Sequence, residues 1–254
     1  MNLPTTPSFS LKNKRALIVG ASSGIGLACA VALAEYGASI TIAARRSQKL
    51  EELSISLKSK SITAELLELD ISKTDKTLQL INDLDPFDIL VNSAGIAKHS
   101  HSLDTKEADF DDVMGINLKG AYFLTMAVAR RLISAKKGGS LINISSQMGL
   151  VGGQERAVYS ASKHAVEGFT KSIAIELGNS DIRVNTICPT FILTDLTKST
   201  FEDPKKLAWI KSKIKLGRVG RVEDIMGAVI FLASDASALI TGSSLVIDGG
   251  WTAE

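Results

Sequence analysis

Residues 15–37 read RALIVGASSGIGLACAVALAEYG, and this stretch decides the fold. The largely apolar run from Arg15 to Val19 predicts a central strand of a parallel sheet, buried on both faces. Gly20 begins a glycine-rich turn, and the residues after the turn predict a helix that ends at Gly37. A strand, a glycine-rich turn and a helix in this order form a cradle for phosphate. Glycine lets an anion approach the backbone, and the helix N-terminus supplies free N–H groups.

The spacing of the turn, G-x-x-x-G-x-G, matches the common dinucleotide fingerprint G-x-G-x-x-G only in part. Glycine-rich turns also occur for purely structural reasons, but the strand and helix on either side favour nucleotide binding. We therefore expect the turn to hold the phosphates of a dinucleotide through six residues. These are Gly20, Ser22, Ser23, Gly24, Ile25 and Gly26.

A second strand is expected over Ala38 to Ala44 (ASITIAA), and Arg45 and Arg46 follow it. A site for NAD usually places Asp or Glu near this position to bind the ribose 2′-OH, whereas a site for NADP supplies Arg for the 2′-phosphate. Arginine at the N-terminus of a helix is otherwise electrostatically unfavourable. The sequence therefore predicts NADP(H), with NAD(H) less favoured, and makes Arg45 the main contact.

Two further strand ends extend the expected cofactor site. The third strand ends at Asp70 and Ile71, on the side of an open α/β sheet where ligands bind. Asp70 either bonds the adenine amino group or caps the following helix, expected around Lys73 to Asp83. The fourth strand, in FDILVNSAG, ends in Asn92-Ser93-Ala94-Gly95. This tail is small and polar, as a backbone lying against a flat ring system requires.

A candidate catalytic pair lies further along, where a buried strand, Leu141 to Ser145, leads through a glycine-rich loop into a helix with Tyr159 and Lys163. Residues four apart lie on one face of a helix. A neighbouring ammonium can lower the pKa of a phenol, which is ordinarily about 10. Ser146 could hold a substrate oxygen beside the phenol. The three side chains predict a proton-transfer site for a carbonyl or alcohol, and a chance pair with a packing tyrosine is the competing interpretation.

Polar residues between these motifs are less informative. Asn117 lies in a mostly helical segment from Ala108 to Lys136, where asparagine is usually unfavourable. It bonds an adjacent carbonyl, marks a kink, or holds a water beside Lys163 and relays protons. His99 and His101 have no further metal-binding cluster beside them. We expect a solvated loop there and no metal.

The C-terminal third contains a strand, Ile182 to Cys188, and then a segment that breaks the pattern, residues 190–216. An insertion at the ligand edge of the sheet predicts a substrate lid. Its many lysines could attract an anionic substrate, although a solvated helical face is the preferred interpretation. The chain closes with a helix from Glu223 to Ala233, the strand SSLVID and Gly249-Gly250-Trp251.

Composition agrees with one α/β domain over residues 1–254, since 45% of the residues are hydrophobic. The net charge is +2 and the basic residues are spread, which argues against nucleic-acid or membrane-surface binding. Cys29 and Cys188 are expected to be buried free thiols in a reducing compartment. The start lacks an apolar signal region, and no run of about eighteen apolar residues exists, so we expect a cytoplasmic protein.

In their order and spacing, these motifs resemble those of the short-chain dehydrogenase/reductase family over nearly the whole chain. Many relatives have glycine where Thr190 follows Pro189, and many NADP users have Lys or Arg at the position of Ser23. The matching pieces are GASSGIG (20–26), NSAG (92–95), Asn117, Ser146, YSASK (159–163), NTICPT (185–190) and DGG (248–250).

The resemblance implies a Rossmann-like, doubly wound α/β fold with a seven-stranded parallel sheet in the order 3-2-1-4-5-6-7 and helices on both faces. It implies a homotetramer, with the Tyr/Lys helix and the last helix and strand at the interfaces. It also extends the cofactor site beyond the residues above. The added cofactor contacts are Tyr159, Lys163, Pro189, Thr190, Ile192 and Thr194.

The catalytic set that the resemblance implies is Asn117, Ser146, Tyr159 and Lys163. Tyr159 would transfer the proton, and Ser146 would orient and polarise the substrate oxygen, so these two also contact the substrate. Lys163 would lower the pKa of the phenol and bond the nicotinamide ribose. Asn117 would support a water chain.

We therefore predict an NADP(H)-dependent oxidoreductase that interconverts a ketone and a secondary alcohol. Carbonyl reductases and alcohol, polyol or sugar-acid dehydrogenases are enzymes of this type. The alternatives are a 3-oxoacyl thioester reductase and a catalytically silent NADP-sensing protein. An epimerase usually needs a larger C-terminal region, and an enoyl reductase a different Tyr–Lys spacing.

Overall fold

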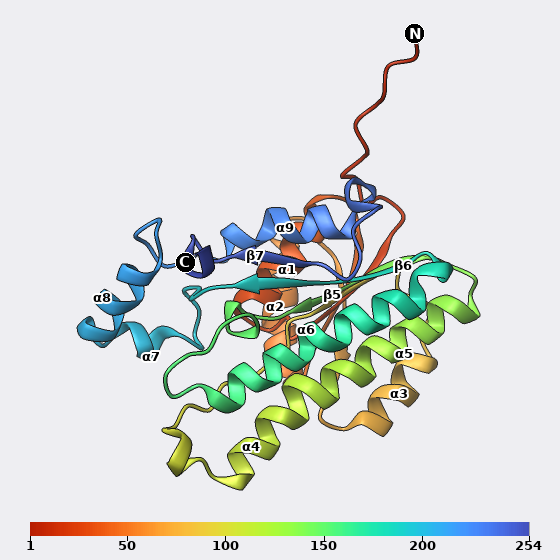
Figure 1. Ribbon diagram of the computed structural model, residues 1–254. Helices are drawn as coiled ribbons and strands as arrows, with labels where there is room; N and C mark the ends of the chain where they lie inside the picture. Colours follow the sequence, from red (N-terminus) through yellow and green to blue (C-terminus); the bar gives the residue numbers. More distant parts are fainter. Residues whose placement is uncertain (254) are drawn as a thin grey trace.

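The computed structural model describes residues 1–253, whose centre is a seven-stranded parallel sheet (Figure 1). The strand order is β3-β2-β1-β4-β5-β6-β7, which confirms the expected doubly wound topology. The strands are β1 (Arg15–Val19), β2 (Ser39–Ala44), β3 (Ala64–Glu68), β4 (Ile89–Asn92), β5 (Gly139–Ile144), β6 (Ile182–Pro189) and β7 (Ser244–Ile247).

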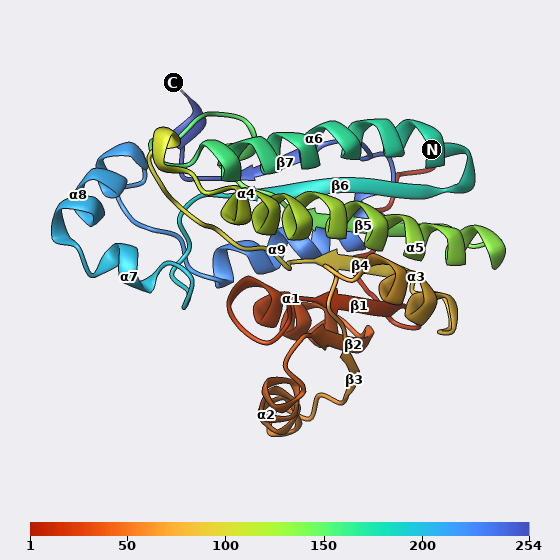
Figure 2. The ribbon, with the colours of Figure 1, turned by 90° about the horizontal axis from the view of Figure 1, so that it is seen from below.

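Helices cover both faces of the sheet (Figures 1 and 2). One face packs against α1 (Gly24–Glu35), α2 (Ser47–Lys58) and α9 (Glu223–Ala233). The other packs against α3 (Thr74–Asn82), α5 (Ala121–Ser134) and α6 (Ala157–Leu177), with α4 (Glu107–Met114) leading into α5. Each face therefore has its own hydrophobic core.

The central strand β1 explains why the apolar run at residues 15–19 contains so few polar residues. Ala16 and Ile18 are fully buried in the core under α1 and α9, while Leu17 and Val19 are buried in the core on the opposite face. Burial on both faces requires a nearly continuous apolar sequence. Because β1 pairs with both β2 and β4, the strand order reverses beside it, and ligands bind at such a switch point.

The segment expected to be mostly helical over residues 108–136 is divided into three parts. Between α4 and α5 lies a π-helical turn, Gly115–Gly120, which contains Asn117. Such turns are wider than α-helical ones and frequently occur at functional sites. The structure therefore supports the interpretation that Asn117 marks an irregularity in the helix.

Residues 190–216 form two short helices, α7 (Lys198–Phe201) and α8 (Pro204–Lys213), which lie beyond the carboxyl ends of the strands (Figures 1 and 2). The Asp203 carboxylate caps the N-terminus of α8, because it accepts hydrogen bonds from the N–H groups of Lys205 and Lys206. Cys29 and Cys188 are buried free thiols, as expected. No helix within residues 1–253 has the length and apolar character needed to cross a membrane.

Candidate active site

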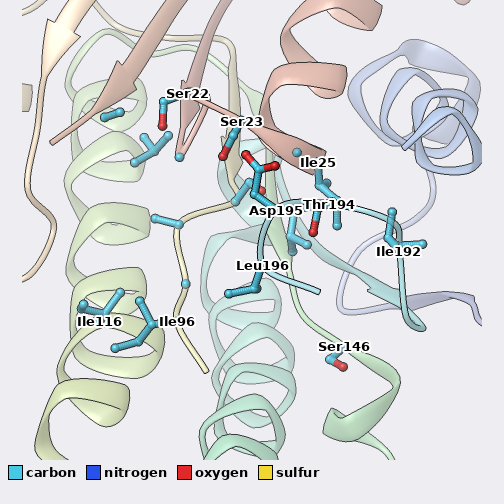
Figure 3. Close-up of a pocket in the computed structure, with 18 of the residues that line it drawn as sticks. Ser22, Ser23, Ile25, Ile96, Ile116, Ser146, Ile192, Thr194, Asp195 and Leu196 are labelled. Atoms are coloured by element: carbon cyan, nitrogen blue, oxygen red, sulfur yellow. The ribbon is translucent and has the colours of Figure 1, made fainter. Parts of the chain in front are cut away.

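A cavity of about 510 Å³ opens at the carboxyl ends of the central strands (Figure 3). It brings the glycine-rich turn, the two arginines after β2 and the Ser/Tyr/Lys group into one space. The predicted site residues that line it are Gly20, Ser22, Ser23, Gly24, Ile25, Arg45, Arg46, Asp70, Ile71, Ala94, Gly95, Ser146, Tyr159, Lys163, Pro189, Thr190, Ile192 and Thr194.

Two of the predicted cofactor residues do not line the cavity but support its wall. Gly26 lies under the turn, where an added Cβ would meet the carbonyl oxygen of Gly20 at 2.3 Å. Asn92 is buried, donates to the Oδ1 atom of Asn143 over 3.1 Å and accepts the N–H of Ala94. In this geometry Gly26 and Asn92 therefore support the cavity wall and do not contact its interior directly.

The glycine-rich turn has the shape that a phosphate cradle needs. Gly20 has a φ of +79°, and an added Cβ there would lie 2.7 Å from the backbone nitrogen of Ala94. Ser23 precedes α1 without capping it through its side chain. The first N–H groups of α1 are consequently left for a ligand at the positive end of the helix dipole. In Figure 3, Thr194 lies beside this turn, and an added Cβ at Gly24 would lie 3.1 Å from its methyl group.

Arg45 and Arg46 follow β2, and both side chains are exposed at the cavity. Within residues 1–253, neither guanidinium forms a hydrogen bond or ion pair. Both charges are therefore available to a ligand phosphate. Asp70 lines the same end of the cavity, and its carboxylate accepts the N–H of Ser72 over 3.0 Å in the turn before α3. Its contact with adenine remains a prediction.

A buried hydroxyl also points to a ligand. The Oγ1 atom of Thr190 has no hydrogen-bond partner among the described residues, and Thr190 lines the cavity. Buried hydroxyl groups in proteins are normally hydrogen-bonded. The cradle, the two open guanidinium groups and this hydroxyl together fit a dinucleotide that carries phosphate and polar ring substituents.

The Tyr159 hydroxyl is in an environment that favours the neutral phenol. Burial raises its pKa, while the hydrogen-bonding Ser146 side chain and the charge of Arg156 lower it. Ser146 accepts the N–H of Met148 over 3.1 Å, which leaves its own proton for another acceptor. The groups that lower the pKa of Tyr159 are thus Ser146 and Arg156. The Nζ atom of Lys163 lies 5.7 Å from the Tyr159 ring centroid, and a lowering of the phenol pKa by this lysine stays a prediction.

A backbone carbonyl of β5 holds the ammonium of Lys163. Its Nζ atom donates to the carbonyl oxygen of Ile144 over 2.9 Å, at the end of β5. Burial lowers its pKa to about 8, against the opposing effects of Cys188 and Glu167. Glu167, one turn further along α6, is buried and accepts hydrogen bonds from the Thr186 hydroxyl (2.9 Å) and the Cys188 thiol (3.3 Å). The lysine is therefore fixed at the end of β5, and a buried carboxylate lies one turn further along its helix.

Asn117 is buried outside the cavity lining and joins segments that are far apart in the chain. Its amide nitrogen donates to the carbonyl of Ile96 (2.9 Å) and to the Ser162 hydroxyl (3.2 Å), and its oxygen accepts the N–H of Ile96 (2.9 Å). An added Cβ at Gly95 would lie 3.3 Å from that oxygen and 3.7 Å from Nζ of Lys163. Asn117 thus fixes the loop beside the lysine, and a water held there remains a prediction.

Sequence reasoning missed the side chains at the outer end of the site. His99 lies exposed in a loop, as expected, but it also bonds Arg156 and packs its ring edge-on to Tyr159 with 6.0 Å between centroids. The guanidinium of Arg156 lies 5.1 Å from the ring centroid of Phe191, which stacks on Trp251. No periodicity in the sequence connects these residues, because four separate segments supply them. Apart from Tyr159, these residues lie outside the cavity lining itself. Residues that do line the cavity and were not predicted include Ile96, Ile116, Ser145, Asp195, Leu196 and Thr197.

Comparison with known proteins finds relatives that match nearly the whole chain. A family model described as enoyl-(acyl carrier protein) reductase matches residues 20–252. The chain is 36% identical to the D-erythrulose reductase of Gallus gallus, with 96% of this chain and 98% of that protein covered. It is 34% identical to the 2-dehydro-3-deoxy-D-gluconate 5-dehydrogenase of Escherichia coli (strain K12), with 97% and 98% covered.

Among solved structures, the chain is similar to a gluconate 5-dehydrogenase from Burkholderia cenocepacia J2315 in complex with NADP and tartrate. The TM-score is 0.93 and the identity is 33%, and the match covers 97% of this chain and 98% of the other. The resemblance thus extends to the architecture of nearly the entire chain.

Proposed function

Since the chain belongs to the short-chain dehydrogenase/reductase family, we propose that it interconverts a ketone and a secondary alcohol of the sugar-acid or polyol class, with NADP(H) as hydride carrier. The observation that carries this proposal is the single cavity that unites the phosphate cradle with Ser146, Tyr159 and Lys163. The names of the similar reductases and dehydrogenases support the substrate class.

The proton step belongs to Tyr159. During reduction its hydroxyl donates the proton to the carbonyl oxygen, and during oxidation the phenolate removes the alcohol proton. Because burial favours the neutral phenol, the resting enzyme is ready for reduction. Ser146 donates a hydrogen bond from its hydroxyl to the same oxygen, while its own oxygen accepts the N–H of Met148. Two donors then stabilise the negative charge that develops there.

Lys163 fixes the position of the phenol relative to the cofactor. One of its three N–H bonds points to the carbonyl of Ile144, which fixes the ammonium and leaves two donors. We assign these to Tyr159 and to the nicotinamide ribose. Asn117 keeps the backbone at Ile96 in place beside the lysine and supports the water through which the phenol regains its proton.

The cofactor supplies a hydride at the nicotinamide ring, and this chain supplies its binding and orientation. The N–H groups at the start of α1 and the hydroxyls of Ser22 and Ser23 hold the phosphates. Arg45 and Arg46 hold the 2′-phosphate, which is why we propose a preference for NADP(H) over NAD(H). The NADP found in the similar gluconate 5-dehydrogenase supports this choice.

Two further features complete the proposal. Residues 190–216 act as a lid over the substrate, because residues 194–197 line the cavity and α7 and α8 continue from them. The protein acts as a homotetramer that buries apolar side chains now exposed on α5 and α6, such as Tyr122 and Ile175. Light scattering should give four times the mass of one chain.

The test is a screen of ketones, keto acids, ketoses and an acetoacetyl thioester for substrate-dependent oxidation of NADPH. We expect turnover of keto sugars or keto sugar acids, and little of the thioester. A preference for the thioester would indicate a 3-oxoacyl reductase instead. Tight NADPH binding without turnover of any compound would indicate a nucleotide-sensing protein and would contradict the proposed activity.

A further inference from the structure

Arg156 occupies a distinctive place at the outer end of the candidate active site. It immediately precedes α6, three residues before Tyr159, and its charge acts on the phenol. Figure 2 shows the first turn of α6 beside the segment that follows β4, from which His99 comes. Arg156 lies just outside the residues that line the cavity, but it bonds His99, whose ring packs edge-on to Tyr159. A substrate whose oxygen reaches Tyr159 and that extends past His99 therefore approaches this guanidinium.

The charge of Arg156 has no acidic partner in the part of the chain that the structure describes. Within residues 1–253, no carboxylate lies at salt-bridge distance from it, although the side chain is partly buried. The fold pairs other cations closely: Lys98 with Asp109 at 2.6 Å, and Arg218 with Asp224 at 2.7 Å. Removing an unpaired charge from water is costly, so an anion that completes the pair is favoured here.

The neighbours of Arg156 fix its direction without neutralising it. His99 contacts the guanidinium, and burial together with the charges of Arg156 and Lys206 lowers the pKa of His99 to about 4. The imidazole is neutral at pH 7 and accepts a hydrogen bond from the arginine. Phe191 lies against the other side of the guanidinium at 5.1 Å, an attractive cation–π arrangement.

An aromatic wall continues outward from this point. Phe191 stacks on Trp251 with 5.6 Å between ring centroids, and Trp209 of α8 meets Trp251 edge-on at 5.5 Å. Among these rings, Phe191 contacts the arginine and is itself held by Trp251. His99 occupies the Nη1 nitrogen, so the edge formed by Nε and Nη2 is left to bind a carboxylate through two parallel hydrogen bonds.

We propose that Arg156, oriented by His99 and Phe191, binds the carboxylate of the substrate. The preferred substrates are then hydroxy and keto sugar acids rather than neutral polyols and ketoses. This inference rests on the proposed function, since it assigns the substrate class of the same site. It assigns no covalent step to Arg156, which is a specificity-determining residue and leaves the proton transfer to Tyr159.

The first experiment compares a six-carbon keto acid, 5-keto-D-gluconate, with L-sorbose, a neutral ketose of the same chain length. In Arg156→Gln, the ratio of kcat/KM for the acid to that for the ketose should fall about 10- to 100-fold, mainly through KM. Arg156→Lys should recover part of the ratio, since it keeps the charge but loses the bidentate fork. Arg130→Gln, an exposed position on α5, is the matched control and should keep the wild-type ratio. An unchanged ratio in Arg156→Gln would overturn the proposal.

The second experiment does not depend on turnover. Calorimetry in saturating NADPH measures the binding of tartrate, a dicarboxylate that is not reduced. Wild type and Arg130→Gln should bind tartrate, and Arg156→Gln should bind it about tenfold more weakly or worse. Equal binding by all three, or none by the wild type, would overturn the assignment of Arg156. If the wild type bound tartrate but reduced no ketone, the proposed function would fail while the carboxylate site remained.

Discussion

The ammonium of Lys163 donates a 2.9 Å hydrogen bond to the backbone carbonyl of Ile144, the last residue of β5. This bond attaches the second turn of α6 to the carboxyl end of β5, next to Ser145 and Ser146. The lysine is 5% exposed, so its charge acts within a water-poor region and its protonation state matters for function.

Lys163 should therefore control the alkaline side of the pH profile. Burial lowers its pKa from 10.5 to about 8, so the free enzyme loses this charge as the pH rises through about 8. Because kcat/KM for NADPH reports the free enzyme, it should fall above this pH. The pKa of Tyr159 is raised, which places loss of the phenol proton at higher pH.

Initial rates measured across the pH range would test this assignment. The variant Lys163→Arg keeps its charge at all these pH values and should lack the fall near pH 8, whatever its absolute rate. A wild-type profile that stays flat through pH 8, or a fall shared by both proteins, would show that another group titrates.

Arg45 should determine the choice of cofactor. Arg45→Gln removes a charge-assisted contact to the 2′-phosphate, so KM for NADPH should rise about 10- to 100-fold while KM for NADH changes little. Lys49→Gln is the matched control, because it removes a nearby positive charge that is already paired with Glu52. Steady-state kinetics with both cofactors measures the effect. A wild-type preference for NADH would refute the assignment.

Gly26 should be indispensable to the cradle. In Gly26→Ala the new methyl group would meet the carbonyl oxygen of Gly20 at 2.3 Å, which forces the turn to shift. We expect a loss of about 1–3 kcal/mol in stability and of most NADPH affinity. Thermal unfolding with and without NADPH measures both quantities.

The same substitution at an open position is the control for Gly26. Nothing lies within 4 Å of a Cβ at Gly227, which is exposed in α9. Gly227→Ala should keep NADPH affinity and raise stability by up to about 1 kcal/mol through helix propensity. Equal NADPH affinity in the two variants would show that the turn tolerates a side chain.

Local patterns were sufficient for most of the fold. The predicted bounds of β1 and α9 coincide with those in the structure, because a short apolar run that ends at a glycine and a helical run that begins with acidic residues are both clear local signals. The strand order 3-2-1-4-5-6-7 is confirmed, but only the family resemblance implied it. The π-helical turn at Asn117 was harder to predict from the sequence, since the hydrogen bonds of Asn117 to Ile96 and Ser162 span 21 and 45 residues.

The site could be predicted where function depends on motifs, and not where it depends on packing. The glycines, Ser146, Tyr159 and Lys163 belong to continuous motifs, and the structure gathers them in one cavity. The influence of Arg156 on the pKa of Tyr159 was not foreseen, because it depends on burial and orientation. His99 lies exposed in a loop, as expected, but its contact with Arg156 was not foreseen, since it joins residues 57 apart in the chain.

The central claim is that the Tyr159 hydroxyl transfers the proton, and its most direct test is ketone-dependent oxidation of bound NADPH in a single turnover by Tyr159→Phe. This variant loses one oxygen atom, and the account predicts a rate about 10²- to 10⁴-fold below that of the wild type. Tyr36→Phe, at a tyrosine that is 44% exposed, should keep the wild-type rate. A wild-type rate in Tyr159→Phe, with NADPH bound and the ketone reduced, would contradict the account.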